Sequence, residues 1–202
     1  MRKTYAPVAV VIGLIALLAG APGAAASTVD PNVPSAVGVA DPASATPEFT
    51  QHNLSDGPVE SDSGDSRPFT YGNILNGLYG VCLDDSSNYG LRAHTCSNES
   101  YNNGYQSWRA AVDGVNMQFK NTKTHLCLDG SSLHGVRTHT CSDASYDNGY
   151  QKWRTYWAPG GHWVSWQNVA TGKCLDYSSG HGLRLHDCSW AAWNNGYQAW
   201  NK

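Results

Sequence analysis

The larger, C-terminal part of the sequence contains few groups suited to acid–base catalysis. Glu99 is the single glutamate between residues 67 and 202. Hydrolysis of a glycosidic bond usually needs two carboxyl groups placed across that bond, so this composition disfavours a glycosidase. The sequence also lacks G-x-S-x-G, H-E-x-x-H and glycine-rich phosphate-loop motifs. We therefore expect a protein that is not an enzyme and uses no cofactor.

The C-terminal part of the sequence has no large excess of either charge, and the whole sequence has only one long apolar run. Residues 67–202 hold eleven Lys and Arg against nine Asp and Glu, so nucleic acid is not an expected partner. The one long apolar run, Ala6–Leu18, follows two basic residues and precedes the small residues Ala24–Ala26, as in a secretory signal peptide. The run is shorter than the ~20 residues of a membrane span. We expect residues 1–26 to be a signal peptide, the protein to be secreted and extracellular, and no membrane span.

Residues 27–66 contain no Lys or Arg, but seven acids and five prolines. Such a segment buries too little apolar surface to offset the entropy lost on folding. We expect a flexible Pro/Ala/Ser-rich acidic leader. In an alternative interpretation, Glu48–Thr50 and Asn53–Leu54 form a short peptide that becomes ordered on a protein partner.

Two sequence blocks recur three times in residues 67–202. The first is Cys-Leu-Asp with a second cysteine 14 positions after the first, and the second is Asn-Gly-Tyr-Gln-x-Trp. The period is 45 and then 47 residues, which is typical of one supersecondary unit per repeat. Short runs alternate with Gly, Asn, Asp and Ser turns, without the apolar spacing of an amphipathic helix. The pattern predicts an all-β domain of three repeats, at about 70–108, 109–153 and 154–200.

All six cysteines belong to these repeats, two in each. An oxidising compartment favours disulfides, and a threefold fold should form the same bond in every repeat. On the chain-entropy model each such bond contributes ~3 kcal/mol. Zinc is the alternative, but the sequence has no C-x-x-C pair, and we expect no metal. The predicted disulfides are Cys82–Cys96, Cys127–Cys141 and Cys174–Cys188.

Strand periodicity assigns the side chains of each repeat to two faces. In the first repeat, Leu83 should face the core while Asp84 points outward. Arg92 and His94 should also point outward, so we expect Asp84 and His94 to lie near one another at the surface. The corresponding residues are Asp129, Arg137 and His139 in the second repeat and Asp176, Arg184 and His186 in the third.

The Gln-x-Trp block is assigned a structural role. Three recurring Trp side chains fit a shared hydrophobic centre, and the Gln amides can cap backbone groups that would otherwise be buried without partners. Gly104 permits a backbone turn that a side chain would hinder. The predicted structural residues are Gln106, Trp108, Gln151, Trp153, Gln198 and Trp200.

Three linked motifs at one spacing resemble the ricin B-chain type (R-type) lectins, a β-trefoil family of carbohydrate-binding modules, over about residues 70–202. In that family the Asp of the Cys-Leu-Asp block binds sugar hydroxyls, and an aromatic residue two positions before the second cysteine stacks on the sugar. Here that stacking position holds His, and Tyr precedes the Gln where the family commonly has Asn. The resemblance implies galactose-like glycans as ligands, bound by Asp84, Arg92, His94, Asn103, Asp129, Arg137, His139, Asn148, Asp176, Arg184, His186 and Asn195.

A further set of residues stands just before the glycine of each connecting loop: Tyr89, His134 and His181. They either line the same pocket or are ordinary surface residues. The leading interpretation is a secreted lectin that recognises cell-surface or wall glycans multivalently through up to three shallow sites. A targeting or adaptor subunit of a larger secreted assembly, docking a protein partner through residues 27–66, is the alternative. A β-trefoil protease inhibitor gains no support from the repeated Asp and His.

Overall fold

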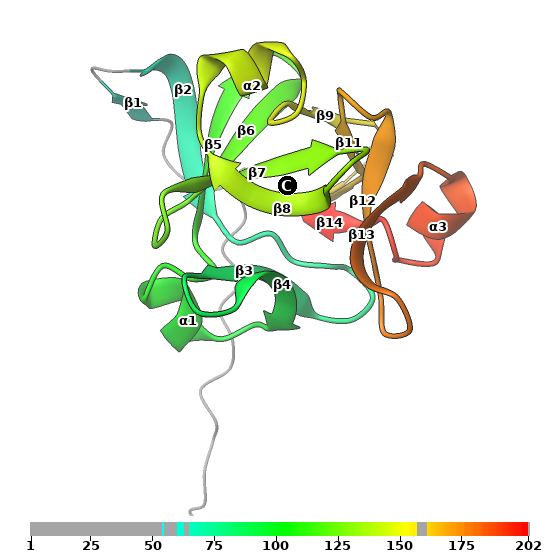
Figure 1. Ribbon diagram of the computed structural model, residues 1–202. Coiled ribbons are helices and arrows are strands. Elements are labelled where there is room, and N and C mark those ends of the chain that lie inside the picture. The colour runs from blue at the N-terminus through cyan, green and yellow to red at the C-terminus, as the bar shows by residue number, and fades with distance from the viewer. Residues whose placement is uncertain (1–53, 55–59, 63–64, 157–160, 202) are drawn as a thin grey trace, which may run out of the picture. The chain divides into compact units, whose positions relative to one another are not determined.

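The computed structural model describes residue 54 and residues 60–62, 65–156 and 161–201 (Figure 1). The chain divides into two units, residues 1–44 and 45–202, and every described residue belongs to the second. The expected signal peptide and most of the expected leader lie outside the described residues. None of the helices in the described ranges is long and apolar enough to cross a membrane.

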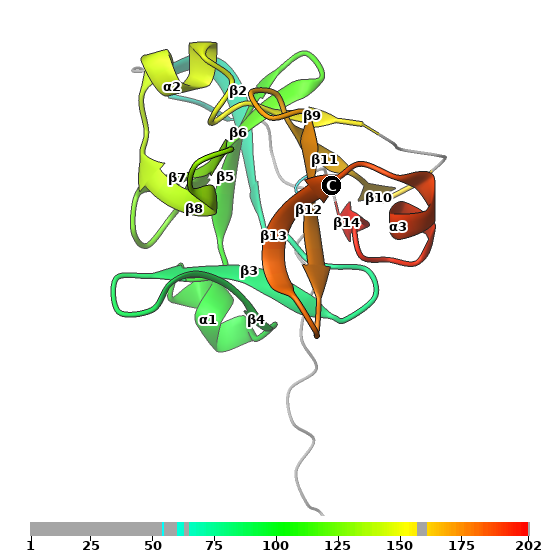
Figure 2. The same cartoon turned by 45° about the vertical axis from the view of Figure 1, so that its right-hand side comes forward.

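Each of the three repeats contains one β-hairpin with the same geometry. In each, two six-residue strands pair antiparallel in the same register, with the Asp of Cys-Leu-Asp opposite the Arg. The hairpins are β3 (Val81–Ser86) with β4 (Gly90–Thr95), β7 (Leu126–Ser131) with β8 (Gly135–Thr140), and β12 (Lys173–Ser178) with β13 (Gly182–Asp187). Strands β4, β8 and β13 contact one another, and both views show the hairpins grouped about a common centre (Figures 1 and 2).

The remaining strands close a barrel between the hairpins. Neighbouring pairs run from β2 to β5, β6, β9 and β11, while β10 pairs with β14 and an Asn76–Trp200 bridge joins the last repeat to the first. This arrangement confirms the all-β trefoil. The strands are β1 (Glu60–Asp62), β2 (Asp65–Gly72), β5 (Trp108–Asp113), β6 (Asn116–Asn121), β9 (Trp153–Thr155), β10 (Trp163–Val164), β11 (Trp166–Asn168) and β14 (Trp200–Asn201).

A short helix follows each hairpin, which the sequence pattern did not predict. The helices are α1 (Asn98–Asn102), α2 (Asp143–Asp147) and α3 (Trp190–Asn194). The serine after each second cysteine is the N-cap, and its hydroxyl accepts a hydrogen bond from the backbone N–H three residues later. Five residues are too few to show a helical apolar period, so the capping serine was the only available signal.

Tryptophan forms the centre of the domain. The three Trp of the Gln-x-Trp blocks are fully buried, and each indole Nε1 donates to the carbonyl of the Leu in its own Cys-Leu-Asp block at 2.9–3.0 Å. A second buried set, eight positions before each first cysteine, packs into the same cluster: Ile74, Phe119 and Trp166. Each repeat therefore supplies two large side chains to one shared core.

Buried asparagines connect consecutive repeats. Asn121 Nδ2 donates to the carbonyl of Tyr105 at 2.9 Å, and Asn168 Nδ2 donates to that of Tyr150 at 2.8 Å. Asn76 closes the ring by donating to the carbonyl of Gly196 at 3.1 Å. Because each Asn fixes the Gly-Tyr-Gln turn of the preceding repeat, the three lobes form one cyclic unit.

The folded unit begins earlier than residue 67. Leu54 is 2% exposed and belongs to the core cluster, and β1 pairs antiparallel with β2, which itself starts at Asp65. The expected boundary is therefore too late, and Leu54 packs into this domain. A single apolar residue in an acidic segment gave no periodic signal for this packing.

Candidate functional site

Each hairpin carries a cluster of one Asp, one Arg and one His, which we call the Asp–Arg–His cluster of its lobe. Lobes 1, 2 and 3 are residues 70–108, 109–153 and 154–200. Arg Nε donates to Asp Oδ1 at 2.9, 3.2 and 2.8 Å in lobes 1, 2 and 3. The members are Asp84, Arg92 and His94; Asp129, Arg137 and His139; and Asp176, Arg184 and His186.

Strand alternation had predicted that Asp84 points outward, but the aspartates of all three clusters are buried. Asp84, Asp129 and Asp176 are only 2–3% exposed. The predicted face is right, but the Gly-Tyr-Gln turn covers it: the N–H of Asp85 donates to the carbonyl of Tyr105 at 2.9 Å. Alternation assigns a side chain to a face, and it cannot show what packs on that face.

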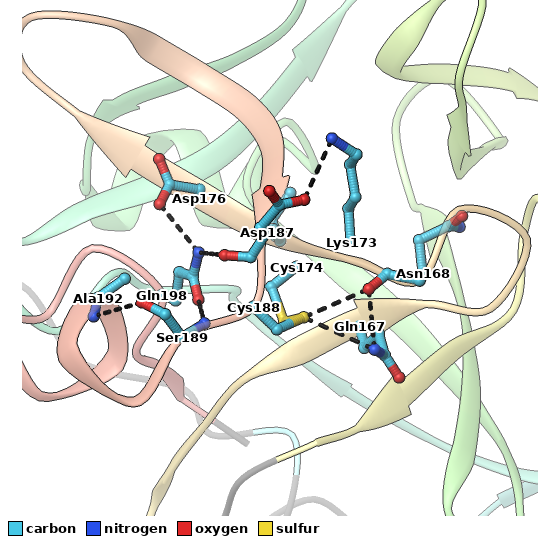
Figure 3. The surroundings of a disulfide bond; sticks show 12 residues. Gln167, Asn168, Lys173, Cys174, Asp176, Asp187, Cys188, Ser189, Ala192 and Gln198 are labelled. Carbon is cyan, nitrogen blue, oxygen red and sulfur yellow. Dashed lines mark hydrogen bonds and ion pairs between the residues drawn. A yellow bond between two sulfur atoms is a disulfide. The ribbon is translucent and has the colours of Figure 1, made fainter. Parts of the chain in front are cut away.

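In lobes 1 and 3, the Gln of the Gln-x-Trp block organises the floor of the cluster. Gln198 Nε2 donates to Asp176 Oδ2 at 3.2 Å and to the Asp187 carbonyl at 3.0 Å, and its Oε1 accepts from the Ser189 N–H at 3.1 Å (Figure 3). Gln106 makes the equivalent bonds in lobe 1. In these two lobes the buried carboxylate is held by both the amide and the guanidinium, which fixes the Arg in place. In lobe 2, Gln151 instead donates to the Thr140 carbonyl at 2.8 Å and accepts from the Ser142 N–H at 3.2 Å.

The Arg and His side chains form the accessible part of each cluster. The Arg side chains are 33–37% exposed, and His94, His139 and His186 are exposed. His94 is paired across the hairpin with Cys82, and this pair stands two residues along each strand from the Asp84–Arg92 pair. Because side chains two residues apart on a strand point to the same face, Asp84, Arg92 and His94 share one face. Nitrogen donors and a flat imidazole ring are therefore presented side by side.

In lobe 2 the cluster lines a pocket of about 330 Å³. Asp129, Arg137 and His139 lie in its wall, and so does His134 of the connecting loop. Asn148 is absent from the lining and instead ends α2 as its C-cap. Sequence reasoning missed four lining residues: Ser131, Leu133, Ser145 and Tyr150.

The loop residues differ between the other two lobes. The Arg92 guanidinium carbon lies 4.6 Å from the centre of the Tyr89 ring, a cation–π contact that joins Tyr89 to the lobe 1 cluster. In lobe 3, His181 Nδ1 is 3.2 Å from Ser178 Oγ within its own loop. Asn103 and Asn195 are exposed C-caps of α1 and α3.

All three predicted disulfides form, and they clamp the hairpins that carry the clusters. Cys82–Cys96, Cys127–Cys141 and Cys174–Cys188 each have Cα atoms 5.0–5.1 Å apart, within the usual range. No cysteine is free for the zinc alternative. In the described ranges, no group of three or more His, Cys, Asp or Glu is placed to hold a metal ion.

A three-lobed β-trefoil with one polar cluster per lobe defines the class of protein. The family model of the ricin-type β-trefoil lectin domain matches residues 70–200. The chain therefore belongs to this family of carbohydrate-binding domains, which supports carbohydrate binding as its function. A comparison with curated proteins finds no match.

Solved structures share the fold at low sequence identity. The designed threefold symmetric protein ThreeFoil is 16% identical with a TM-score of 0.53, covering 65% of this chain and 96% of that one. The hemolytic lectin CEL-III is 24% identical with a TM-score of 0.51, covering 72% of this chain and 30% of that one. A GlcNAcα1-4Gal-releasing endo-β-galactosidase from Clostridium perfringens is 14% identical with a TM-score of 0.54, covering 65% and 31%. These similarities establish the trefoil fold alone.

Proposed function

We propose that this protein is a secreted lectin that binds glycans through up to three sites, one at each Asp–Arg–His cluster. The proposal rests on one observation: the Asp–Arg–His cluster recurs in all three lobes, with the same cross-strand Asp–Arg pair in each. A scaffold without a ligand would need the buried aspartates for stability, but it would not need an exposed His beside each of them.

The burial of the aspartates changes the roles that we propose. Asp84 orients Arg92, whose outer guanidinium nitrogens donate to sugar hydroxyls, while the His94 ring stacks against the apolar face of the sugar. In lobe 2 the carboxylate of Asp129 remains in the pocket wall and can also accept a hydroxyl hydrogen. Asn103, Asn148 and Asn195 would contribute only from the helix ends.

Each site is shallow, so a single contact should be weak. A monosaccharide of about 12 heavy atoms at ~0.3 kcal/mol per atom reaches millimolar affinity. Because the three lobes form one cyclic body, a dense glycan surface can engage several of them at once and raise avidity by ~10² to 10⁴. We propose a cell-surface or wall glycan with galactose-like sugars as the target. Catalysis is not proposed.

Residues 1–26 are proposed to be the signal peptide, and the segment that follows is proposed to be a leader ending before Leu54. The alternative function is a targeting or adaptor subunit whose leader docks a protein partner. A pull-down with and without residues 27–53 separates the two, because a lectin alone loses no partner when this segment is removed.

The exposed histidines give the sharpest test of sugar binding. Replacing the three aspartates would disturb buried hydrogen bonds and confuse binding with folding. Replacing His94, His139 and His186 together by Ala should leave the melting temperature unchanged and abolish retention on a glycan array. His162→Ala is the matched control, because His162 is exposed but lies outside the hairpins. Undiminished retention of the triple variant would refute the assignment.

A further inference from the structure

A second pocket, of about 960 Å³, is lined in part by Cys127 and Cys141 and shares no lining residue with the pocket of the His139 cluster. Strands β2, β5 and β6 supply part of its lining, which we call the strand wall, and α2 supplies another part, which we call the helix wall. These elements are neighbours in Figure 1. We call the whole pocket the strand-face pocket. Its volume falls in the range of pockets that bind small ligands.

The strand wall carries a row of cations. Tyr71 pairs across the sheet with Arg109, and Arg109 pairs with Lys120, so three neighbouring strands direct these side chains to one face. Arg67 lies on the same face of β2, four positions before Tyr71. Arg67 is fixed by Gln118, which accepts from its Nη2 at 2.9 Å and itself donates to Gln151 at 3.1 Å.

The helix wall is acidic and aromatic. Asp143 and Asp147 of α2 line the pocket, together with Tyr146, whose ring lies 4.6 Å from the Arg67 guanidinium carbon. The charges are therefore segregated, with guanidinium and ammonium groups on the strands and carboxylates on the helix. A ligand that suits both walls bears an anionic group for the cations and hydroxyls that can donate to the carboxylates.

Two locally unfavourable features meet in this pocket. Arg109 and Lys120 are like charges directly opposite each other across two strands, which is destabilising. His125 is the one non-glycine residue of the described chain with positive φ, at 61°, whereas lobes 1 and 3 have Gly80 and Gly172 at this position. Departures from local rules that converge on one cavity are typical of functional sites.

The cation pair is confined to lobe 2. In lobe 3, Arg154 and Gln167 stand at the positions of Arg109 and Lys120 and pair with each other. At the same positions in the remaining copy, the N–H of Asn201 donates to the carbonyl of Leu75. The fold therefore does not require the pair.

We infer that the strand-face pocket binds an acidic sugar, with its carboxylate or sulfate held by Arg67, Arg109 and Lys120. The hydroxyls of that sugar donate to Asp143 and Asp147, and the exposed ring of Tyr71 packs on its apolar face. This site is separate from the three Asp–Arg–His clusters and breaks the threefold symmetry of the domain.

The test is an amide NMR titration of the full oxidised protein with four probes: methyl glucuronide, glucose 6-sulfate, methyl glucoside and inorganic sulfate. The acidic sugars should shift the Lys120 and His125 amides saturably, while the neutral sugar should not. Comparing the affinities of methyl glucuronide and glucose 6-sulfate shows whether the pocket prefers a carboxylate or a sulfate. Inorganic sulfate binding as tightly as the acidic sugars, or no saturable shift with either sugar, would overturn the inference.

Two variants of the pocket and one control variant define the site. Lys120→Gln, which installs the lobe 3 residue, should weaken acidic-sugar binding ~10-fold. Lys173→Gln removes the same charge from an exposed position of lobe 3 and should leave binding unchanged. His125→Gly should weaken binding without lowering the melting temperature, because it restores the residue of the other lobes. Equal effects of the two lysine variants would refute a local site.

The outcome is distinguishable from that of the proposed lectin function. Shifts at His94, His139 and His186 on addition of neutral glycans report the threefold sites and should persist in Lys120→Gln. Binding of neutral but not acidic sugars would refute this inference alone.

Discussion

Asp85 shows how one position of the repeat serves three different purposes. In lobe 1 its buried carboxylate accepts hydrogen bonds from the Thr124 and Thr138 hydroxyls of lobe 2. Lobe 2 has Gly130 at this position, where a Cβ would lie 2.8 Å from Asn168 Cγ. Lobe 3 has Tyr177, which packs edge-on against Tyr79 at 5.2 Å. Duplicated positions thus diverged where each lobe meets its neighbour.

Residue-scale predictions from the sequence were most reliable for the apolar and cysteine positions. The Trp core and the disulfides follow from patterns that depend on burial and on repetition. The outward Asp84 was wrong because the covering turn comes from another part of the repeat. The strand-face pocket was missed because Arg67 is distant in sequence from Arg109 and Lys120, and because the Arg109–Lys120 pair occurs in only one lobe.

Tyr146 should make stability depend on high pH. Burial, together with its hydrogen bond to the Asp113 carboxylate, raises the Tyr146 pKa to about 12. Because the folded-state pKa exceeds the ordinary value of about 10, its contribution is complete below pH 10 and is lost as pH rises through 12. A shift of this size corresponds to at most about 3 kcal/mol.

Denaturant unfolding of the wild type and Tyr146→Phe between pH 8 and 12 measures this effect. The variant should be less stable at pH 8, and the difference between the two proteins should shrink toward pH 12. A constant difference across this range would contradict the assignment.

At the scale of elements, the hairpins were predictable and the helices were not. Alternation and the two cysteines fix the strands of each hairpin, whereas α1, α2 and α3 are each about one turn long and depend on a single capping serine. The Asn-Gly-Tyr-Gln turn after each helix has positive φ at glycine, between 83° and 87°. These turns form the contacts between successive lobes.

Gly149→Ala should therefore be strongly destabilising. A Cβ at Gly149 would lie 2.8 Å from the backbone nitrogen of Ala170 in the next lobe, in addition to the cost of positive φ. Gly114→Ala is the matched control, because Gly114 has φ of 61° but nothing within 4 Å of its Cβ position. We expect about 1 kcal/mol for Gly114→Ala and at least ~3 kcal/mol for Gly149→Ala in urea unfolding. Equal losses would show that the lobe contact contributes nothing.

At the scale of the whole molecule, the threefold trefoil was predictable because the repeat appears in the sequence three times. The N-terminal boundary of the domain was not predictable, because Leu54 belongs to no repeat. The core nevertheless includes Leu54, and β1 pairs with β2.

A chain that starts at residue 67 should melt well below one that starts at residue 45. Leu54→Ala in the full chain should cost about 2–4 kcal/mol, because it leaves a cavity in the core. Thermal unfolding of the three proteins checks this expectation. Identical melting temperatures for the two truncations would place the domain boundary at 67 after all.

The proposed function requires the three Asp–Arg–His clusters to bind one glycan surface together. The direct measurement is the apparent Kd on a dense galactose-terminated surface for variants with one, two and three of His94, His139 and His186 replaced by Ala. We expect affinity to fall ~10-fold or more with each lobe that is inactivated, and we expect no binding by the triple variant. A single replacement that removes all binding, or a triple variant that binds like the wild type, would contradict it.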